Sequence, residues 1–126
     1  MNPRAARAYK NVAVSSARPT RVLDELFCRL RRDLMGAHEA CQARDVEARC
    51  KALAHAMKIV TALEAGLDRE AAPSLCDQLA SLYGFVKDRI LVANLRAEAS
   101  AIAEAYDVIV ALHDAFAQLE APALAA

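Results

Sequence analysis

Residues 79–95 read LASLYGFVKDRILVANL, and this stretch decides the fold. Apolar side chains recur along it every three or four residues, which is the spacing of one helix face. They are Leu79, Leu82, Val86, Ile90 and Ala93. Tyr83, Leu91 and Val92 lie beside that face, so the apolar arc is wider than packing on one neighbour requires. The stretch is therefore predicted to be a helix that lies in a bundle centre or lends apolar surface to a partner.

The composition favours one helical domain. The chain has 126 residues, enough to bury a core, and only three glycines and four prolines. Its 16 basic and 16 acidic residues balance, which argues against a nucleic-acid partner. No apolar run approaches the roughly 20 residues of a membrane span, and no apolar stretch follows the N-terminus as in a secretory signal. We therefore expect no nucleic acid and no membrane insertion.

Two helices are predicted before the quoted stretch. The first is expected from Pro19 to about Ala43, because a proline suits the first helical turn, where its missing N–H has no partner. The second is expected after Asp45, whose carboxylate can accept hydrogen bonds from the free N–H groups of a first turn. Gly66 follows it and is predicted to end the helix in a left-handed conformation. Both helices carry a continuous apolar face.

Two more helices complete the pattern. The quoted stretch belongs to a helix opened by Pro73. Gly84 lies inside it at a cost of about 1 kcal/mol relative to alanine, which a close neighbouring backbone would explain. The last helix is expected over residues 98–119 and is predicted to end before Pro122.

Short connectors make consecutive helices antiparallel. The predicted fold class is all-α, an antiparallel up-down four-helix bundle over residues 19–120. Residues 1–18 are assigned to a short N-terminal arm and residues 121–126 to a flexible tail.

Few residues in the chain offer catalytic or metal chemistry. Motifs such as GxSxG, HExxH and the phosphate-binding glycine loop are absent, as is the Glu-x-x-His pair of a di-iron bundle. The best zinc combination is His38 and Cys41 with Cys50 and His55, but Cys50 and His55 are five residues apart and do not share a helix face. We therefore predict no enzyme activity, no cofactor and no metal, with the four cysteines reduced.

Several short motifs follow one another in an order that is specific as a set. On the N-terminal side they are Tyr9 with Val12 and Val14, then Ser16–Pro19, then Leu26-Phe27. In the middle helices they are Ala56–Val60 with Leu63 and Leu67, then Leu82–Val86, Arg89 and Ala93-Asn94, with Phe116 near the end. With these motifs the chain resembles the flagellar secretion chaperones of the FliS type over about residues 9–118.

The first helix departs from the pattern of that family. Arg18 replaces a serine that would cap the helix, and Asp24 stands where the family prefers a leucine. Leu26-Phe27 stands where the family has Leu-Tyr. Cys28 and Arg29 replace the Asn or Asp and the Gly that usually follow, and Phe116 replaces a tryptophan. The first helix is therefore more charged than in its relatives, which leaves partner choice on this helix open.

The resemblance implies a binding function without chemistry. Family members are antiparallel bundles that cover the disordered C-terminal segment of flagellin, which wraps around the bundle and becomes partly helical. By resemblance, this chain is expected in the bacterial cytosol, where it would prevent premature flagellin polymerisation and deliver cargo to a component of the export gate. The alternative is a divergent helical adaptor or regulator that binds another export component. The apolar surface would also support a homodimer without cargo.

Six residues are predicted to belong to the docking surface. They are Ile59, Leu63, Tyr83, Val86, Ile90 and Asn94. For most of them the alternative is a place in the bundle core, and for Val86 and Ile90 the core is the favoured prediction. In the N-terminal arm, Tyr9, Val12 and Val14 are predicted to cap the cargo groove when cargo is absent, with a frayed terminus as the alternative.

Overall fold

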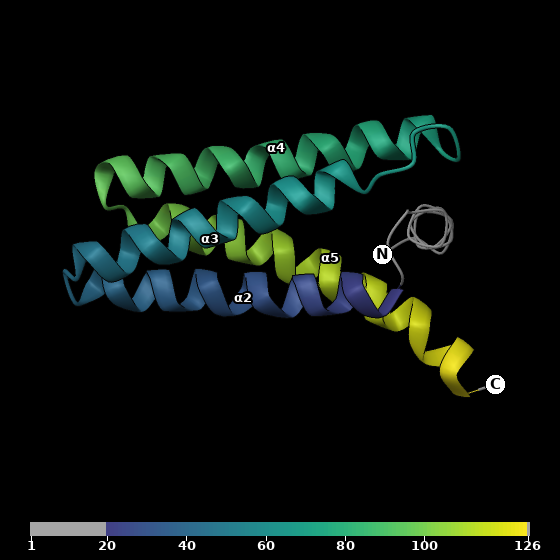
Figure 1. Cartoon of the computed structure of the whole chain (residues 1–126), viewed down its shortest axis with the longest axis horizontal. Helices are drawn as coiled ribbons and strands as arrows, with labels where there is room; N and C mark the ends of the chain where they lie inside the picture. The colour runs from purple at the N-terminus through teal and green to yellow at the C-terminus, as the bar shows by residue number, and fades with distance from the viewer. Residues whose placement is uncertain (1–19, 126) are drawn as a thin grey trace.

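The computed structural model describes residues 20–125, which form four α-helices (Figure 1). They are α2 (Thr20–Gln42), α3 (Val46–Ala65), α4 (Pro73–Arg96) and α5 (Ala99–Ala125). Each helix packs on the next along the chain, and α2 also packs on α5, which closes the ring. Consecutive helices run in opposite directions in Figure 1. The predicted antiparallel four-helix bundle is confirmed, while residues 1–18 lie outside the described residues.

Two predicted helix starts are confirmed by their local chemistry. The Asp45 side chain accepts a hydrogen bond from the backbone N–H of Ala48 at 3.1 Å and so caps α3. Pro73 is the first residue of α4, where its missing N–H costs nothing. These two residues fix where the chain re-enters the bundle after each of the first two connectors.

The prediction for Gly66 is wrong. Its φ of −82° is right-handed, and its N–H donates to the carbonyls of Ala62 and Leu63, so the helix tightens its last turn instead of reversing. The left-handed residues of the described chain are instead Arg44, with φ 58°, and Ala97, with φ 53°. Both follow a helix end, and both carry a Cβ that makes this conformation costly.

The last helix is longer than predicted. The α5 helix continues to Ala125, through Pro122 and through residues assigned to a flexible tail. A proline removes one N–H donor and crowds the carbonyl four residues earlier, and near a helix end this cost falls on a single turn. The expected end before Pro122 is therefore wrong.

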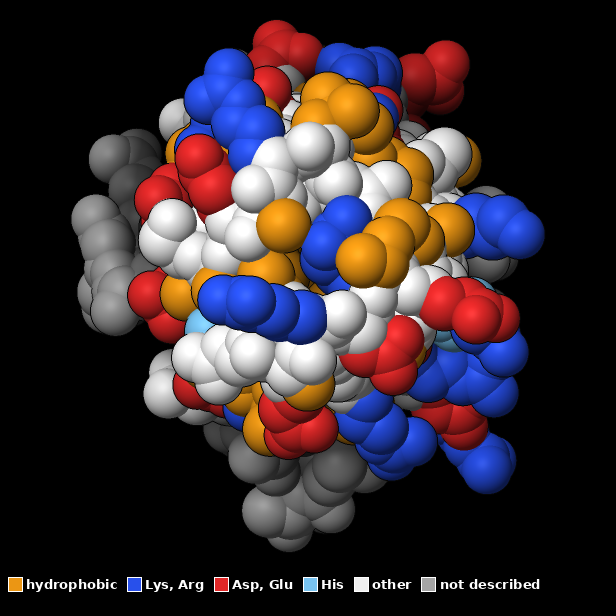
Figure 2. Space-filling view, turned by 90° about the vertical axis from the view of Figure 1, so that its left-hand side faces the viewer, with side chains coloured by type: hydrophobic (Ala, Val, Ile, Leu, Met, Phe, Trp, Pro, Cys, Tyr) orange, Lys and Arg blue, Asp and Glu red, His pale blue; other side chains and the backbone are white. Residues whose placement is uncertain are grey.

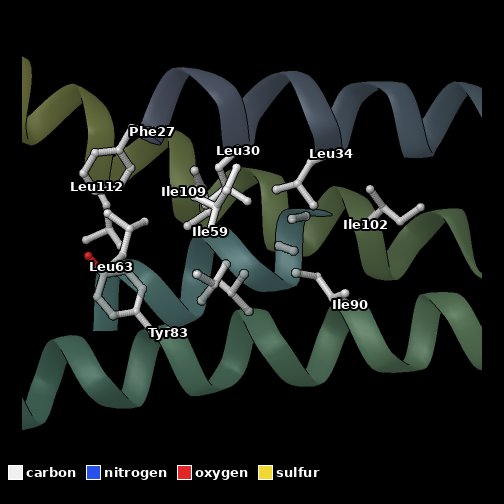
Figure 3. Packing of buried hydrophobic residues seen from close by; sticks show 14 of the residues in the cluster. Phe27, Leu30, Leu34, Ile59, Leu63, Tyr83, Ile90, Ile102, Ile109 and Leu112 are labelled. Carbon is white, nitrogen blue, oxygen red and sulfur yellow. The ribbon is translucent and has the colours of Figure 1, made fainter. Parts of the chain in front are cut away.

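The core lies between all four helices (Figure 3). Its largest fully buried side chains include Phe27 and Leu34 from α2, Leu53 from α3, and Ile109 and Phe116 from α5. The predicted stripe of α4 enters the same core, except that Leu82 lies at its edge and is 38% exposed. None of the described helices is both long and apolar enough to cross a membrane.

Candidate functional site

Five of the six residues predicted to dock a partner lie in the core. They are Ile59, Leu63, Tyr83, Val86 and Ile90, each at most 5% exposed. Figure 3 shows Leu63 and Tyr83 among the buried side chains of the core. These side chains pack the bundle, as the alternative of a place in the core has it, and the exposed apolar side chains of α3 and α4 are their neighbours. Their contact with a partner stays a prediction.

Asn94, the sixth residue, lies half-buried where α4 ends beside the start of α3. Its backbone carbonyl accepts a hydrogen bond from Nη2 of Arg49 at 3.2 Å. The last carbonyls of a helix have no intrahelical donor, so Arg49 of α3 supplies one to α4. The contact joins α3 to α4 at the end of the bundle that carries the α2–α3 and α4–α5 turns.

Two polar atoms at this contact are buried without a hydrogen-bond partner. They are Nε of Arg49 and Oδ1 of Asn94, and no other buried side-chain nitrogen or oxygen of the described residues shares this condition. A buried donor or acceptor left unpaired costs about 1–3 kcal/mol. A donor and an acceptor are therefore left together in the seam between α3 and α4.

Large apolar side chains surround these polar atoms on the surface. Val46 at the start of α3 is 57% exposed, and Leu91 and Leu95, one turn apart on α4, are 54% and 84% exposed. Figure 2 looks onto this end of the molecule and shows hydrophobic side chains gathered among basic ones. We call Val46, Leu91 and Leu95, with Arg49 and Asn94, the end patch.

The opposite flank of α4 also carries apolar surface. Leu82 and Phe85 are 38% and 42% exposed. Arg89 covers part of this flank: its guanidinium lies 5.8 Å from the centre of the Phe85 ring and 3.8 Å from Glu104 of α5. The wide apolar arc predicted for α4 is thus present on both sides of its buried stripe, and the flank that faces α3 is the more exposed.

Gly84 lies on the outer surface of α4. Apart from Gly84 itself, its chain neighbours and the nearby backbone of its own helix, no heavy atom of the described residues lies within 4 Å of the position that a Cβ would take. The close backbone that would explain the glycine is therefore not present among the described residues. The glycine leaves a smooth stretch of helix surface within one turn of Lys87, whose Nζ pairs with Glu64 of α3 at 3.2 Å.

The zinc combination considered from the sequence does not assemble. The Cys41 thiol donates to the carbonyl of Ala97 at 3.2 Å, and the His55 ring pairs with Asp33 of α2. His38 instead lines a groove between α2 and α5 of about 270 Å³, whose floor includes Leu34 and Ile102. Among the described residues, these four side chains do not form a group of possible metal ligands.

Comparison with known proteins places the chain. The family model described as flagellar protein FliS matches residues 1–123. The chain belongs to the FliS family. The flagellar secretion chaperone FliS of Salmonella typhimurium is 34% identical over 118 residues, which cover 90% of this chain and 87% of that protein. The resemblance inferred from the motifs is confirmed.

Proposed function

We propose that this FliS-family chain is a cytosolic export chaperone that binds the disordered C-terminal segment of flagellin. Bound in this way, the segment cannot polymerise before export and is delivered to a component of the export gate. The observation that carries the proposal is the end patch, where Val46, Leu91 and Leu95 are exposed around the unpaired atoms of Arg49 and Asn94. The relative from Salmonella typhimurium, named a flagellar secretion chaperone, supports it.

The chemistry of the end patch fits a helical segment. Apolar side chains one turn apart on the segment would cover Leu91 and Leu95, which are themselves one turn apart. A polar side chain beside them would pair with Nε of Arg49 or Oδ1 of Asn94, which lack partners in the described part of the chain. Such pairing removes a desolvation cost of about 1–3 kcal/mol, so it favours the bound state over the free one.

A disordered segment needs more contact than the end patch alone, because it loses chain entropy when it folds on the surface. The outer surface of α4 offers that contact. Gly84 leaves room there for close approach, since apart from its chain neighbours and its own helix nothing among the described residues lies within 4 Å of its missing Cβ. Leu82 and Phe85 extend the apolar surface on the other flank. The segment would therefore start at the end patch and follow α4.

The N-terminal arm enters the same proposal. Tyr9, Val12 and Val14 lie outside the described residues, and their apolar side chains would occupy the cargo groove when cargo is absent. Deletion of residues 1–15 is then expected to tighten cargo binding or to cause aggregation through the uncovered surface, including a homodimer. Unchanged affinity and an unchanged monomer would contradict the arm's part in the proposal.

Calorimetric titration with the C-terminal segment of flagellin tests the function, with helicity followed by circular dichroism. Wild type is expected to bind one segment with a gain of helix. Leu95→Asp is expected to weaken binding at least about tenfold, since it puts a charge into the apolar contact. Met35→Asp is the matched control, because Met35 is a half-exposed apolar residue beside the groove between α2 and α5.

Each result has a separate meaning. Equal weakening by Leu95→Asp and Met35→Asp would remove the end patch from the proposal but keep flagellin as the cargo. No binding by folded wild type would overturn the function. It would favour a helical adaptor for another export component. The exposed charged residues Asp24 and Arg29 of α2, which differ from the pattern of the family, support that alternative.

A further inference from the structure

His113 of α5 is held against α2 in a defined position. The residue is 8% exposed. Its ring stacks on the ring of Phe27, with 5.3 Å between the ring centroids and 13° between the ring planes. Its Nε2 lies 2.8 Å from Oδ1 of Asp24 and 3.9 Å from Sγ of Cys28. An imidazole nitrogen, a carboxylate and a thiol thus converge on one point at the edge of the bundle.

These three groups are ligands that zinc prefers in proteins. Their donor atoms all lie within 4.8 Å of one another, and no other group of three possible metal ligands occurs among the described residues. Tetrahedral zinc with ordinary bond lengths separates its nitrogen from its oxygen by about 3.3 Å and its nitrogen from its sulfur by about 3.5 Å. The observed 2.8 and 3.9 Å differ from these by roughly half an ångström.

We propose that Asp24, Cys28 and His113 form a zinc site that joins α2 to α5. Asp24 and Cys28 are four residues apart on α2, so they project from one face of the helix. The Asp24 side chain is half exposed, so the fourth zinc position faces solvent and takes a water molecule. This is the open arrangement of three protein ligands and one exchangeable ligand.

The protons can be accounted for. Nη1 of Arg31 lies 3.1 Å from Nδ1 of His113. A guanidinium can only donate a hydrogen bond, so Nδ1 is the acceptor and carries no proton. The ring proton is therefore on Nε2, which donates it to Asp24. Zinc needs the Nε2 lone pair. On binding, the ring proton moves to Nδ1 by exchange with solvent, and the Cys28 thiol loses its proton to water. One zinc ion therefore replaces one proton.

Arg31 has other partners when Nδ1 becomes protonated. The same Nη1 is 3.6 Å from Oδ1 of Asp114, and the guanidinium carbon is 5.9 Å from the centre of the Tyr106 ring. Turning toward Asp114 takes Arg31 away from the new Nδ1–H without leaving its charge unpaired. The carboxylate of Asp24 and the thiolate of Cys28 together neutralise the zinc charge, so no net positive centre faces Arg31.

The site would distinguish this chain within its family. By the family resemblance, a leucine is preferred at the position of Asp24, and Asn or Asp at that of Cys28, so two of the three ligands are departures from that pattern. They come together with His113 only because α2 and α5 pack side by side. Zinc would fix the start of α2, next to the N-terminal arm.

Cobalt(II) titration of the reduced full-length chain tests the site, since cobalt takes zinc ligands and reports a bound thiolate by a near-ultraviolet charge-transfer band. One equivalent is expected to bind with that band, and zinc is expected to displace it. Cys28→Ser is expected to abolish the band. Asp24→Asn is expected to weaken binding at least about tenfold, which is the least that loss of a ligand should cost. Circular dichroism of each variant checks its folding.

Matched controls come from the other half of the bundle. Cys50→Ser and His55→Gln remove a half-buried cysteine and an exposed histidine at a distance from the cluster and are expected to keep the band and the affinity. His113→Gln is informative only if it folds, because the ring packs on Phe27. If His113→Gln does not fold, Cys28→Ser and Asp24→Asn test the site. No charge-transfer band with wild type, or a band that survives Cys28→Ser, would overturn the proposal. Flagellin binding is measured separately and does not depend on this outcome.

Discussion

The seam between α2 and α5 and the seam between α3 and α4 satisfy their polar groups differently. In the first, His113 contacts Asp24 and Arg31, and the Tyr106 hydroxyl donates to the sulfur of Met35 at 3.6 Å. In the second, Nε of Arg49 and Oδ1 of Asn94 are buried without a partner among the described residues. Buried polar atoms in native proteins are nearly always paired. Among the described residues, the first seam leaves no buried side-chain nitrogen or oxygen unpaired, whereas the second leaves two that a bound molecule could pair.

The largest expected effect concerns the complete seam. Phe27→Ala removes a fully buried ring that lies against His113 and Phe116, and it is expected to lower the free energy of unfolding by about 3–5 kcal/mol. Urea denaturation measures it. Phe85→Ala is the control on α4, where the ring is 42% exposed, and about 1 kcal/mol or less is expected. Similar losses in both variants would contradict the difference between buried and surface rings.

The next effect concerns the incomplete seam. Asn94→Ala removes an oxygen that is buried without a hydrogen bond among the described residues, so the free energy of unfolding is expected to rise, by at most about 1–3 kcal/mol. Affinity for the flagellin segment is expected to fall about tenfold, the equivalent of one hydrogen bond made only in the complex. Denaturation and calorimetry give the two numbers. Gln78→Ala, which removes an exposed amide on α4, should leave the free energy of unfolding and the affinity unchanged. A large loss of stability for Asn94→Ala would show that the Asn94 side chain already has a structural partner.

Two glycines sharpen the comparison further. Gly84→Ala and Gly36→Ala each put a methyl group into open space on a helix, so each is expected to raise the free energy of unfolding by about 1 kcal/mol. Only Gly84→Ala is expected to weaken flagellin binding, because only Gly84 lies on α4. Thermal denaturation and calorimetry measure the two quantities. Equal affinities for both variants would exclude close approach of the segment at Gly84.

The smallest expected effect is at the turn that ends the incomplete seam. Ala97 is left-handed, with φ 53°, at a cost of about 1–2 kcal/mol for a residue with a Cβ. Glycine relieves that strain but loses about 0.4–1 kcal/mol through the freer unfolded chain. Ala97→Gly is therefore expected to stabilise the chain by roughly 0.5 kcal/mol, measured by urea denaturation. Destabilisation would mean that the methyl group of Ala97 makes a packing contact of its own.

Periodicity and caps were sufficient to predict the helices. The N-cap at Asp45 and the proline start at Pro73 depend on residues within a few positions, so local sequence determines them. Gly66 and Pro122 were predicted wrongly, because hydrogen bonding in the last turn of α3 and the small cost of a proline near a helix end decide those boundaries.

The candidate site was harder to predict. A helical repeat shows that Tyr83 and Ile90 share an apolar arc, but it does not show which part of the arc faces the core. Arg49 was missed altogether, since its role is to donate to a carbonyl of α4, 45 residues away in the sequence. The cluster of Asp24, Cys28 and His113 was not predicted either, because these residues meet only through the packing of α2 on α5. Only Asn94 was both predicted for a partner and found at the surface seam.

Amide hydrogen exchange of the full chain, with and without the flagellin segment, tests the central claim most directly. The first amides of α3, at Val46 and Glu47, have no hydrogen-bond acceptor within the helix and should exchange fast in the free chain. The account predicts that the segment slows exchange at residues 46–50 and 91–97 while residues 24–31 and 106–114 stay unchanged. Protection confined to α2 and α5, with the end patch unaffected, would contradict it.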